Sequence, residues 1–158
     1  MKQINKYKKD SKEIIALTLN YLAEDNKFSF LTTFEIFLDL YLVDDKKIEK
    51  VNAQFRGKAE PTNVLSFAYL TGEDFNTAPN PLYLGEIFIS METLVRESLE
   101  QNITEEQHYV RLLIHGLLHL LGFDHNVEIE ARLMYNTEEN ILHKLKLSTN
   151  SIVANYWR

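Results

Sequence analysis

The sequence predicts a single domain in which several helices pack on a few strands. The chain has 158 residues, 45% of them hydrophobic and 25% charged, which suits one globular domain. One stretch alternates apolar and polar side chains with the period of a half-buried strand. Several others begin at a capping residue and repeat apolar side chains at helical spacing. We expect about four strands and about five helices.

The first 43 residues are expected to form a strand, a helix and a second strand. Residues 2–7 are assigned to a short strand. Asp10 and Glu13 stand at the spacing of a capping box, so a helix should run from Asp10 to about residue 26. Residues 32–43 place apolar side chains on one parity, which predicts a strand with one buried face. Those apolar residues are Phe34, Ile36, Leu38, Leu40 and Leu42.

The middle of the chain is expected to add one helix and two strands. Asp44 or Asp45 can cap a helix that Gly57 ends in the left-handed conformation. Strands are predicted at residues 63–70 and 82–90. The segment 71–81 is rich in Gly, Asn, Asp and Pro, which indicates a mobile loop.

Three further helices are predicted in the last part of the chain. Ser90 can cap a helix that runs to about residue 102. Thr104 and Gln107 form a second capping box, which opens a helix through the apolar residues that follow. The last helix should cover residues 127–146. Residues 147–158 show no periodicity, so we expect a poorly ordered tail.

Three of the five histidines lie close together after the second capping box. His115 and His119 are four residues apart, so a helix places both imidazoles on one face. Gly122 should end that helix, and His125 follows just beyond its end. Such a trio, with a position left for water or substrate, is typical of a catalytic zinc site.

The spacing of this cluster matches the metzincin proteases, whose motif is H-E-x-x-H-x-x-G-x-x-H. The three histidines and Gly122 occupy the matching positions, but Gly116 replaces the glutamate that serves as general base. The chain has no cysteine, which leaves imidazole, carboxylate and water as ligands. The sequence therefore predicts one metal ion per chain, Zn²⁺ or another divalent transition metal, without the proteolytic base.

Charge and hydropathy restrict the partners. The net charge of −6 argues mildly against a nucleic-acid partner, yet residues 1–58 carry eleven Lys and Arg against nine Asp and Glu. A locally basic surface there could meet phosphates. No apolar run approaches the roughly 20 residues that span a membrane, and the start lacks the apolar segment of a signal peptide. We expect a cytoplasmic protein without a membrane partner.

Three segments together resemble the YbeY family of bacterial endoribonucleases and rRNA maturation factors. They are residues 52–56 (NAQFR) with 61–67 (PTNVLSF), 84–90 (LGEIFIS) and 115–125 (HGLLHLLGFDH). The resemblance implies that residues 1–146 form one metallo-endoribonuclease domain with an α+β fold. In that fold a small mixed sheet carries the helices, and the metal site lies at a cleft on the histidine helix. One zinc-like ion would be held by His115, His119 and His125.

The resemblance also implies a function. Members of the family hydrolyse single-stranded RNA, so the chain is expected to be an endoribonuclease that acts in 3′-end processing of ribosomal RNA. Ribosome maturation and quality control are implied as well, with the ribosome or ribosome-associated proteins as partners. The nucleophile would be metal-activated water or a hydroxyl of the RNA.

Arg56 is the residue that we expect to act on the phosphate. It falls on the essential arginine of the family, and a guanidinium stays charged and offers forked donors to phosphate oxygens. Lys58 is expected to add a looser phosphate contact, and Ser66 to line the cleft. Without the resemblance, a surface salt bridge would be the simplest role for Arg56.

The missing base directs attention to nearby carboxylates. Glu86 is one hypothesis, because its strand lies near the cleft in the family. Asp124 is another, and it can equally orient a histidine or stabilise a turn. A positioned base is typically worth about 10²–10⁴ in rate, so an enzyme without one would be slow.

Two other functions stay open. The histidines also permit a hydrolase of another substrate, such as a peptide, although Gly116 argues against it. The second is a ribosome-assembly factor with a structural metal and no nuclease activity. Structural zinc usually has four protein ligands, so coordination by Asp124 would favour this second function. An open position facing a cleft that contains Arg56 would favour the enzyme.

Overall fold

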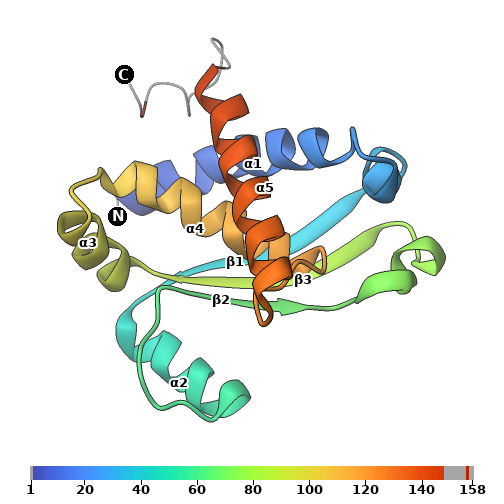
Figure 1. The fold of residues 1–158 in the computed structure, drawn as a ribbon. Helices are drawn as coiled ribbons and strands as arrows, with labels where there is room; N and C mark the ends of the chain where they lie inside the picture. The colour runs from blue at the N-terminus through green and yellow to red at the C-terminus, as the bar shows by residue number, and fades with distance from the viewer. Residues whose placement is uncertain (1, 148–155, 157–158) are drawn as a thin grey trace.

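The computed structural model describes residues 2–147 and Tyr156, and it has an α+β fold (Figure 1). The elements in chain order are α1 (Lys2–Leu22), η1 (Asn26–Thr32), β1 (Ile36–Val43), α2 (Asp45–Arg56), β2 (Val64–Ala68), η2 (Gly72–Thr77), β3 (Leu82–Ser90), α3 (Met91–Glu100), α4 (Glu105–Leu120) and α5 (Glu128–Leu147). The short elements η1 and η2 are 3-10 helices. The strands form one mixed sheet in the order β1–β3–β2.

The central strand β3 runs parallel to β1 and antiparallel to β2. Four of its side chains are fully buried, namely Leu82, Leu84, Ile87 and Ile89. Gly85 adopts a φ of +135°, and a Cβ there would stand 2.0 Å from the carbonyl oxygen of Phe67. Only glycine therefore lets β2 and β3 approach each other at this point.

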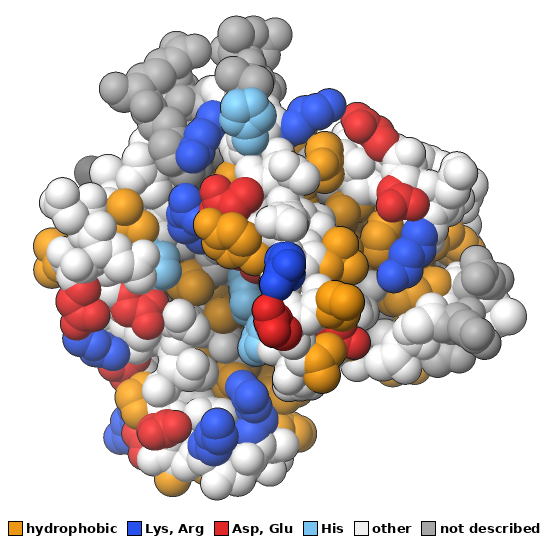
Figure 2. Space-filling view, in the orientation of Figure 1, with side chains coloured by type: hydrophobic (Ala, Val, Ile, Leu, Met, Phe, Trp, Pro, Cys, Tyr) orange, Lys and Arg blue, Asp and Glu red, His pale blue; other side chains and the backbone are white. Residues whose placement is uncertain are grey.

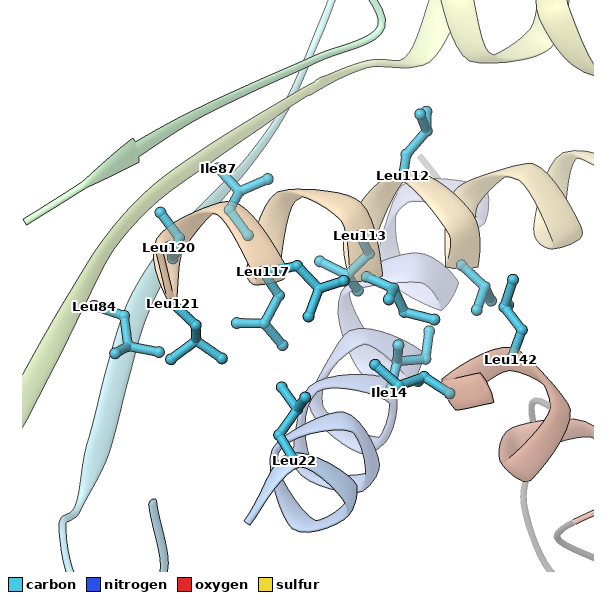
Figure 3. Close-up of a cluster of buried hydrophobic side chains, with 14 of the residues drawn as sticks. Ile14, Leu22, Leu84, Ile87, Leu112, Leu113, Leu117, Leu120, Leu121 and Leu142 are labelled. Atoms are coloured by element: carbon cyan, nitrogen blue, oxygen red, sulfur yellow. The ribbon is translucent and has the colours of Figure 1, made fainter. Parts of the chain in front are cut away.

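Helices cover both faces of the sheet. α1 and α4 lie on one face, α2 lies on the other, and α5 crosses α4 and packs on it (Figure 1). Figure 3 shows leucines of α4 among side chains from α1, β3 and α5. The labelled partners are Ile14, Leu22, Leu84, Ile87 and Leu142. Because α4 touches all of these elements, the core as a whole positions the side chains that α4 carries.

The caps predicted for α2, α3 and α4 are confirmed. The Asp44 side chain accepts a 2.7 Å hydrogen bond from a backbone N–H of the first turn of α2, and Gly57 ends this helix at φ +69°. Ser90 caps α3, and Thr104 with Gln107 forms the capping box of α4. These side chains satisfy backbone groups that a helix start leaves unpaired.

The predicted strands after residue 32 are also confirmed: β3 has the predicted ends, and the other two strands are shorter. The strand predicted at residues 32–43 begins at Ile36, and its side chains alternate between half-buried and exposed up to Leu42. β2 is shorter than the predicted strand at residues 63–70. The predicted loop at residues 71–81 contains the 3-10 turn η2.

The prediction for the N-terminus is wrong before Asp10, whereas the helix predicted from Asp10 is confirmed as far as Leu22. Residues 2–7 belong to α1, so the sheet has three strands and not four. Asp10 does not cap a helix, because it lies inside α1 and is buried. The buried face of α1 includes Tyr7, Ser11, Ile14, Thr18 and Leu22. The Ser11 and Thr18 hydroxyls donate to carbonyls one turn earlier, which lets these polar side chains be buried on a helix.

The tail predicted at residues 147–158 lies outside the described residues, apart from Leu147 and Tyr156. The Tyr156 hydroxyl donates to the buried Asp10 carboxylate, and its carbonyl accepts a 2.9 Å hydrogen bond from Gln107. Within the described part of the chain, no helix is both long enough and apolar enough to cross a membrane.

Candidate metal centre

His115, His119 and His125 come together at the end of α4, and one ligand atom from each lies within 4.8 Å of the others. The His115 and His119 ring centroids are 4.7 Å apart, and that of His125 lies 5.6 and 4.9 Å from them. α4 ends at Leu120, and Gly122 follows at φ +90°, where a left-handed conformation reverses the chain. This reversal brings His125 back to the helix.

Hydrogen bonds fix the direction of two imidazoles. His115 Nδ1 lies 2.6 Å from Oε1 of Glu138 on α5. His119 Nδ1 lies 2.9 Å from the carbonyl oxygen of Phe123. A carboxylate and a carbonyl are acceptors, so in the neutral form of each ring Nδ1 carries the hydrogen and Nε2 keeps a lone pair. Both Nε2 atoms are therefore in the form that binds a metal.

The two Nε2 atoms face each other at 3.1 Å. Two nitrogen lone pairs at this distance repel each other, and a cation between them would turn the repulsion into attraction. Three imidazoles without a thiolate suit zinc, nickel, copper or iron. The residues present therefore fit a divalent transition metal, with His125 as the third ligand.

The environment favours the neutral form of the central histidine. Burial lowers the pKa of His119, and the neighbouring rings of His115 and His125 lower it further. Because metal binding requires the neutral imidazole, a lowered pKa makes His119 available to a metal over a wider range of pH.

Gly116 lies where α4 touches the sheet. A Cβ at this position would stand 3.0 Å from Ile87 Cγ2 and 3.0 Å from Ser66 Oγ. A glutamate here would have to enter the contact between α4 and the strands. The tight packing of α4 on β2 and β3 is thus a physical reason why the metzincin base is missing.

The histidines lie in an open cleft of about 440 Å³. Its lining comes from α2, β2, α4 and adjoining loops: Arg56, Thr62, Asn63, Val64, Leu65, Ser66, His115, His119, Asp124, His125 and Asn126. Figure 2 shows pale-blue histidines in a hollow near the centre of the molecule, with Lys and Arg gathered below it, over α2. Arg56, the last residue of α2, therefore shares a cleft with the histidines.

Two other residues singled out in the sequence, Ser66 and Asp124, also line the cleft. The Ser66 hydroxyl is buried, and no described atom is its hydrogen-bond partner. Asp124 accepts a 2.7 Å hydrogen bond from the backbone N–H of His125 and another from the Asn126 amide. These bonds stabilise the turn that carries the third histidine. Lys58 is not among the lining residues.

The structure does not bring Glu86 to the cleft. The neighbouring Ile87 packs below Gly116, and successive side chains of a strand point to opposite faces of the sheet. Glu86 therefore points away from the histidines. It lies near Tyr41, whose pKa is raised by burial and by the carboxylates of Asp39 and Glu86.

The sequence interpretation missed several residues of the site. Glu138 orients His115 from another helix, and its place in the sequence gives no sign of this contact. Thr62, Asn63 and Asn126 line the cleft as well. The available signal was proximity, since Asn126 directly follows the third histidine and the other two belong to the segment that resembles the family.

Comparisons with known proteins match most of the chain. The family described as Endoribonuclease YbeY matches residues 1–146. Endoribonuclease YbeY of Ehrlichia chaffeensis is 39% identical over 142 residues, which are 90% of this chain and 84% of that protein. Endoribonuclease YbeY of Syntrophomonas wolfei is 39% identical over 145 residues, with coverages of 89% and 90%.

A solved structure extends the similarity to three dimensions. The solution structure of a Thermotoga maritima protein has a TM-score of 0.55 and 27% identity to this chain, covering 89% of this chain and 84% of that one. The sequence match spans the fold and includes all three histidines and Arg56. The chain therefore belongs to the YbeY family of endoribonucleases.

Proposed function

We propose that this protein is a zinc-dependent endoribonuclease that cuts single-stranded RNA, with ribosomal RNA as its natural substrate. The observation that carries the proposal is the cleft in which Arg56 and the three histidines meet. Phosphodiester cleavage needs stabilisation of negative charge and an activated nucleophile, and this combination can supply both. The relatives above support RNA as the substrate class, because they are named endoribonucleases.

His115, His119 and His125 are the proposed ligands of the ion. When bound to three neutral imidazoles, zinc acts as a Lewis acid and lowers the pKa of water that it binds to around 7. The Glu138 carboxylate and the Phe123 carbonyl keep the two Nε2 atoms of α4 turned toward the cleft.

Arg56 is the proposed phosphate-binding residue. A guanidinium presents paired donors that match two phosphate oxygens. Ser66 lines the same cleft and is a second proposed contact to the substrate, which requires its buried hydroxyl to rotate away from Gly116. Lys58 follows Gly57 and does not line the cleft, so it would contact the RNA at a nucleotide away from the one that Arg56 binds.

The lining of the cleft contains few side chains that could act as a general base. Asp124 is its one carboxylate, and both oxygens accept hydrogen bonds within the turn. We propose water or a hydroxyl of the RNA as the nucleophile. Without a dedicated base, which is typically worth about 10²–10⁴ in rate, the enzyme should be slow.

A cleft that places Arg56 beside the histidines suits an unpaired strand better than a duplex. A duplex keeps its bases stacked and its two backbones apart, whereas an unpaired strand can place one phosphate between Arg56 and the histidines. We propose that the domain of residues 1–146 acts in the cytoplasm on the 3′ end of ribosomal RNA. Maturation and quality control of ribosomes would then bring it to the ribosome or to ribosome-associated proteins.

The first test is cleavage of a labelled single-stranded RNA. His119→Ala and Arg56→Ala should each lower the cleavage rate at least about 10²-fold, because each removes a source of charge stabilisation in the cleft. Zinc content should fall in the His119 variant and stay unchanged in the Arg56 variant.

The matched control is Arg132→Ala, since Arg132 is an exposed arginine of α5 that pairs with Glu128 and does not line the cleft. This variant should cut RNA like the parent. Equal cleavage by all four proteins would point to a contaminating nuclease and would contradict the proposal.

A further inference from the structure

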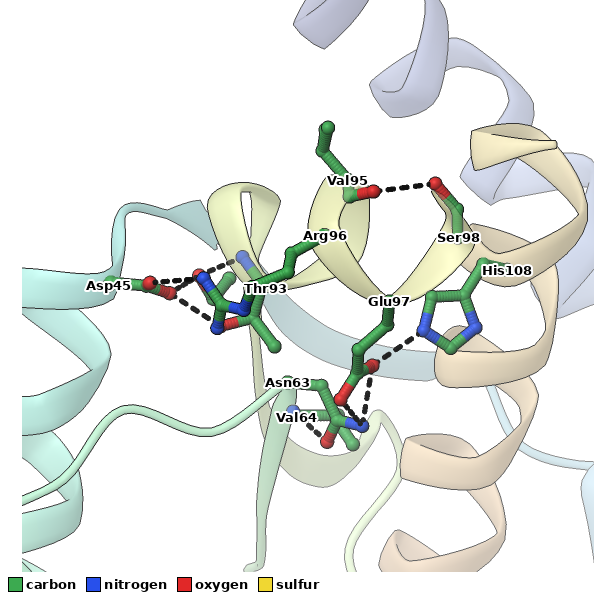
Figure 4. Close-up of polar contacts among 10 residues, drawn as sticks. Asp45, Asn63, Val64, Thr93, Val95, Arg96, Glu97, Ser98 and His108 are labelled. Atoms are coloured by element: carbon green, nitrogen blue, oxygen red, sulfur yellow. Dashed lines mark hydrogen bonds and ion pairs between the residues drawn. The ribbon is translucent and has the colours of Figure 1, made fainter. Parts of the chain in front are cut away.

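A second polar cluster lies beyond the histidines, between α3 and α4 (Figure 4). His108 of α4 is buried, with 5% of its surface exposed, and its Nε2 lies 2.6 Å from Oε2 of Glu97 on α3. The Asn63 amide donates to both oxygens of the same carboxylate, at 3.2 and 3.0 Å. One carboxylate thus joins two helices and the residue that precedes β2.

Asn63 forms hydrogen bonds with the backbone of both β2 and β3. Its side-chain oxygen accepts a 2.7 Å hydrogen bond from the N–H of Val64, the first residue of β2. Its carbonyl accepts a 2.9 Å hydrogen bond from the N–H of Ser90, the last residue of β3. An asparagine held at three points in this way leaves the start of β2 little freedom.

This ordered segment is part of the cleft. Residues 62–64, which we call the cleft wall, all line it, whereas Glu97 and His108 do not. The Glu97 and His108 side chains keep 26% and 6% of their surface exposed, so leaving either without its partner would be costly. The cluster therefore transmits the packing of α3 against α4 to a surface that faces the histidines.

We propose that Glu97 and His108 are positioning residues for the substrate strand. Through Asn63 they hold the cleft wall at the place where a phosphate can lie between Arg56 and the histidines. They touch neither the metal site nor the strand, so their loss should weaken substrate binding more than the chemical step. The inference rests on the proposed function, because it assigns the wall to an RNA strand.

The test measures kcat, KM and zinc content on a labelled single-stranded RNA. Glu97→Gln keeps the volume but replaces an acceptor oxygen by an amide donor, so one of the two partners loses its hydrogen bond. KM should rise about tenfold, the equivalent of one charged hydrogen bond, while kcat and zinc content stay at the parental level. Glu100→Gln, at an exposed position of α3, is the matched control and should leave KM unchanged.

Replacements of His108 separate the effect of its hydrogen bond from the effect of its side-chain volume. His108→Gln keeps a nitrogen donor for the carboxylate and should leave KM close to the parental value. His108→Leu keeps the volume without the donor and should raise KM as Glu97→Gln does. Asn63→Ala should raise KM too, and the double variant Asn63→Ala/Glu97→Gln should be no worse than the poorer single variant, because both act through one contact.

Three results of the kinetic measurements would overturn the inference. The first is that the effects of Asn63→Ala and Glu97→Gln on KM are additive. The second is that KM does not change. The third is that kcat falls only as much as the amount of folded, zinc-loaded protein falls. Hydrogen exchange at residues 57–66 provides a readout without activity, since Glu97→Gln should speed exchange at the Val64 amide. A parent that cuts no RNA would count against the proposed function, whereas unchanged exchange would count against the positioning role itself.

Discussion

Single residues decide how the metal site is oriented. Glu138 holds the Nδ1 side of His115, and a carbonyl does the same for His119. Such partners fix the tautomer and the ring direction of a metal-binding histidine.

The first residue-scale prediction concerns this carboxylate. Glu138→Ala should weaken zinc binding about 10–100-fold, because His115 loses the acceptor that orients it. Competition with a chromophoric chelator measures the affinity. Glu139→Ala is the control, since Glu139 is the next residue of α5 and pairs with Arg111. Equal affinities in the two variants would show that Glu138 is not needed to orient the ligand.

The histidines could be predicted from the sequence, and their partners could not. The spacing of His115, His119 and Gly122 is a local pattern that one helix and its end translate directly into geometry. Glu138 and Asn63 reach the site from other elements, so their roles follow from tertiary packing and not from spacing. Glu86 shows the reverse case. It belongs to a segment that resembles the family, but its position in β3 points its side chain away from the histidines.

At the level of elements, the contact of α4 with the sheet is the tightest constraint near the site. A Cβ at Gly116 would already stand 3.0 Å from side-chain atoms of Ile87 and Ser66, so a long side chain fits only if these neighbours move. This contact determines how deeply the histidine helix sits.

The element-scale prediction is that the metzincin glutamate cannot be restored. Gly116→Glu should lower the free energy of unfolding by about 3 kcal/mol or more, because it overfills a close contact and buries a carboxylate. Urea unfolding followed by circular dichroism measures the change. Gly116→Ala should fall between this variant and the parent. A Glu variant as stable as the parent would show that α4 can move away from β2 and β3.

Secondary structure was predictable where it depends on neighbouring residues in the sequence. Asp44, Ser90 and Thr104 cap the starts of helices, and the alternation of side chains in β1 is typical of a strand. In α1 the apolar spacing after Asp10 correctly predicted a helix as far as Leu22. Residues 2–7 carry only two apolar side chains, Ile4 and Tyr7, which is too little periodicity to tell a helix turn from a short strand.

The whole molecule depends on a core in which a few polar groups are enclosed with the apolar ones. Tyr109 of α4 is fully buried, and its hydroxyl lies 2.6 Å from Ser11 Oγ of α1. Burial raises the pKa of Tyr109 to about 12, and the nearby Asp10 also raises it. This residue links the stability of the whole fold to alkaline pH.

The molecule-scale prediction follows from that link. In the unfolded chain tyrosine ionises near pH 10, whereas folded Tyr109 keeps its proton to about pH 12. The stabilising contribution is therefore complete below pH 10 and is lost as the pH rises toward 12, by at most about 1.4 kcal/mol per pH unit. Urea midpoints at pH 8, 10 and 11 measure it. Tyr109→Phe should show a shallower decline, and an identical slope would contradict the assignment.

The arrangement of the whole cleft was beyond local sequence patterns. Arg56 and His115 belong to different parts of the chain, and only the packing of α2 and α4 on opposite faces of the sheet brings them to one opening. The family resemblance supplied this juxtaposition in advance, since a related sequence carries the geometry of its fold with it.

The position of α4 also bears on how this protein can change over generations. One side of the helix fills the core, Gly116 touches the sheet, His115 and His119 face the cleft, and His108 ties the helix to α3. Almost every turn of α4 is thus constrained both by the packing of the core and by the site, so few substitutions in this helix can be neutral. Sequence drift should collect on the outer surfaces of α1 and α5, so the motif around these histidines is expected to outlast most of the remaining sequence.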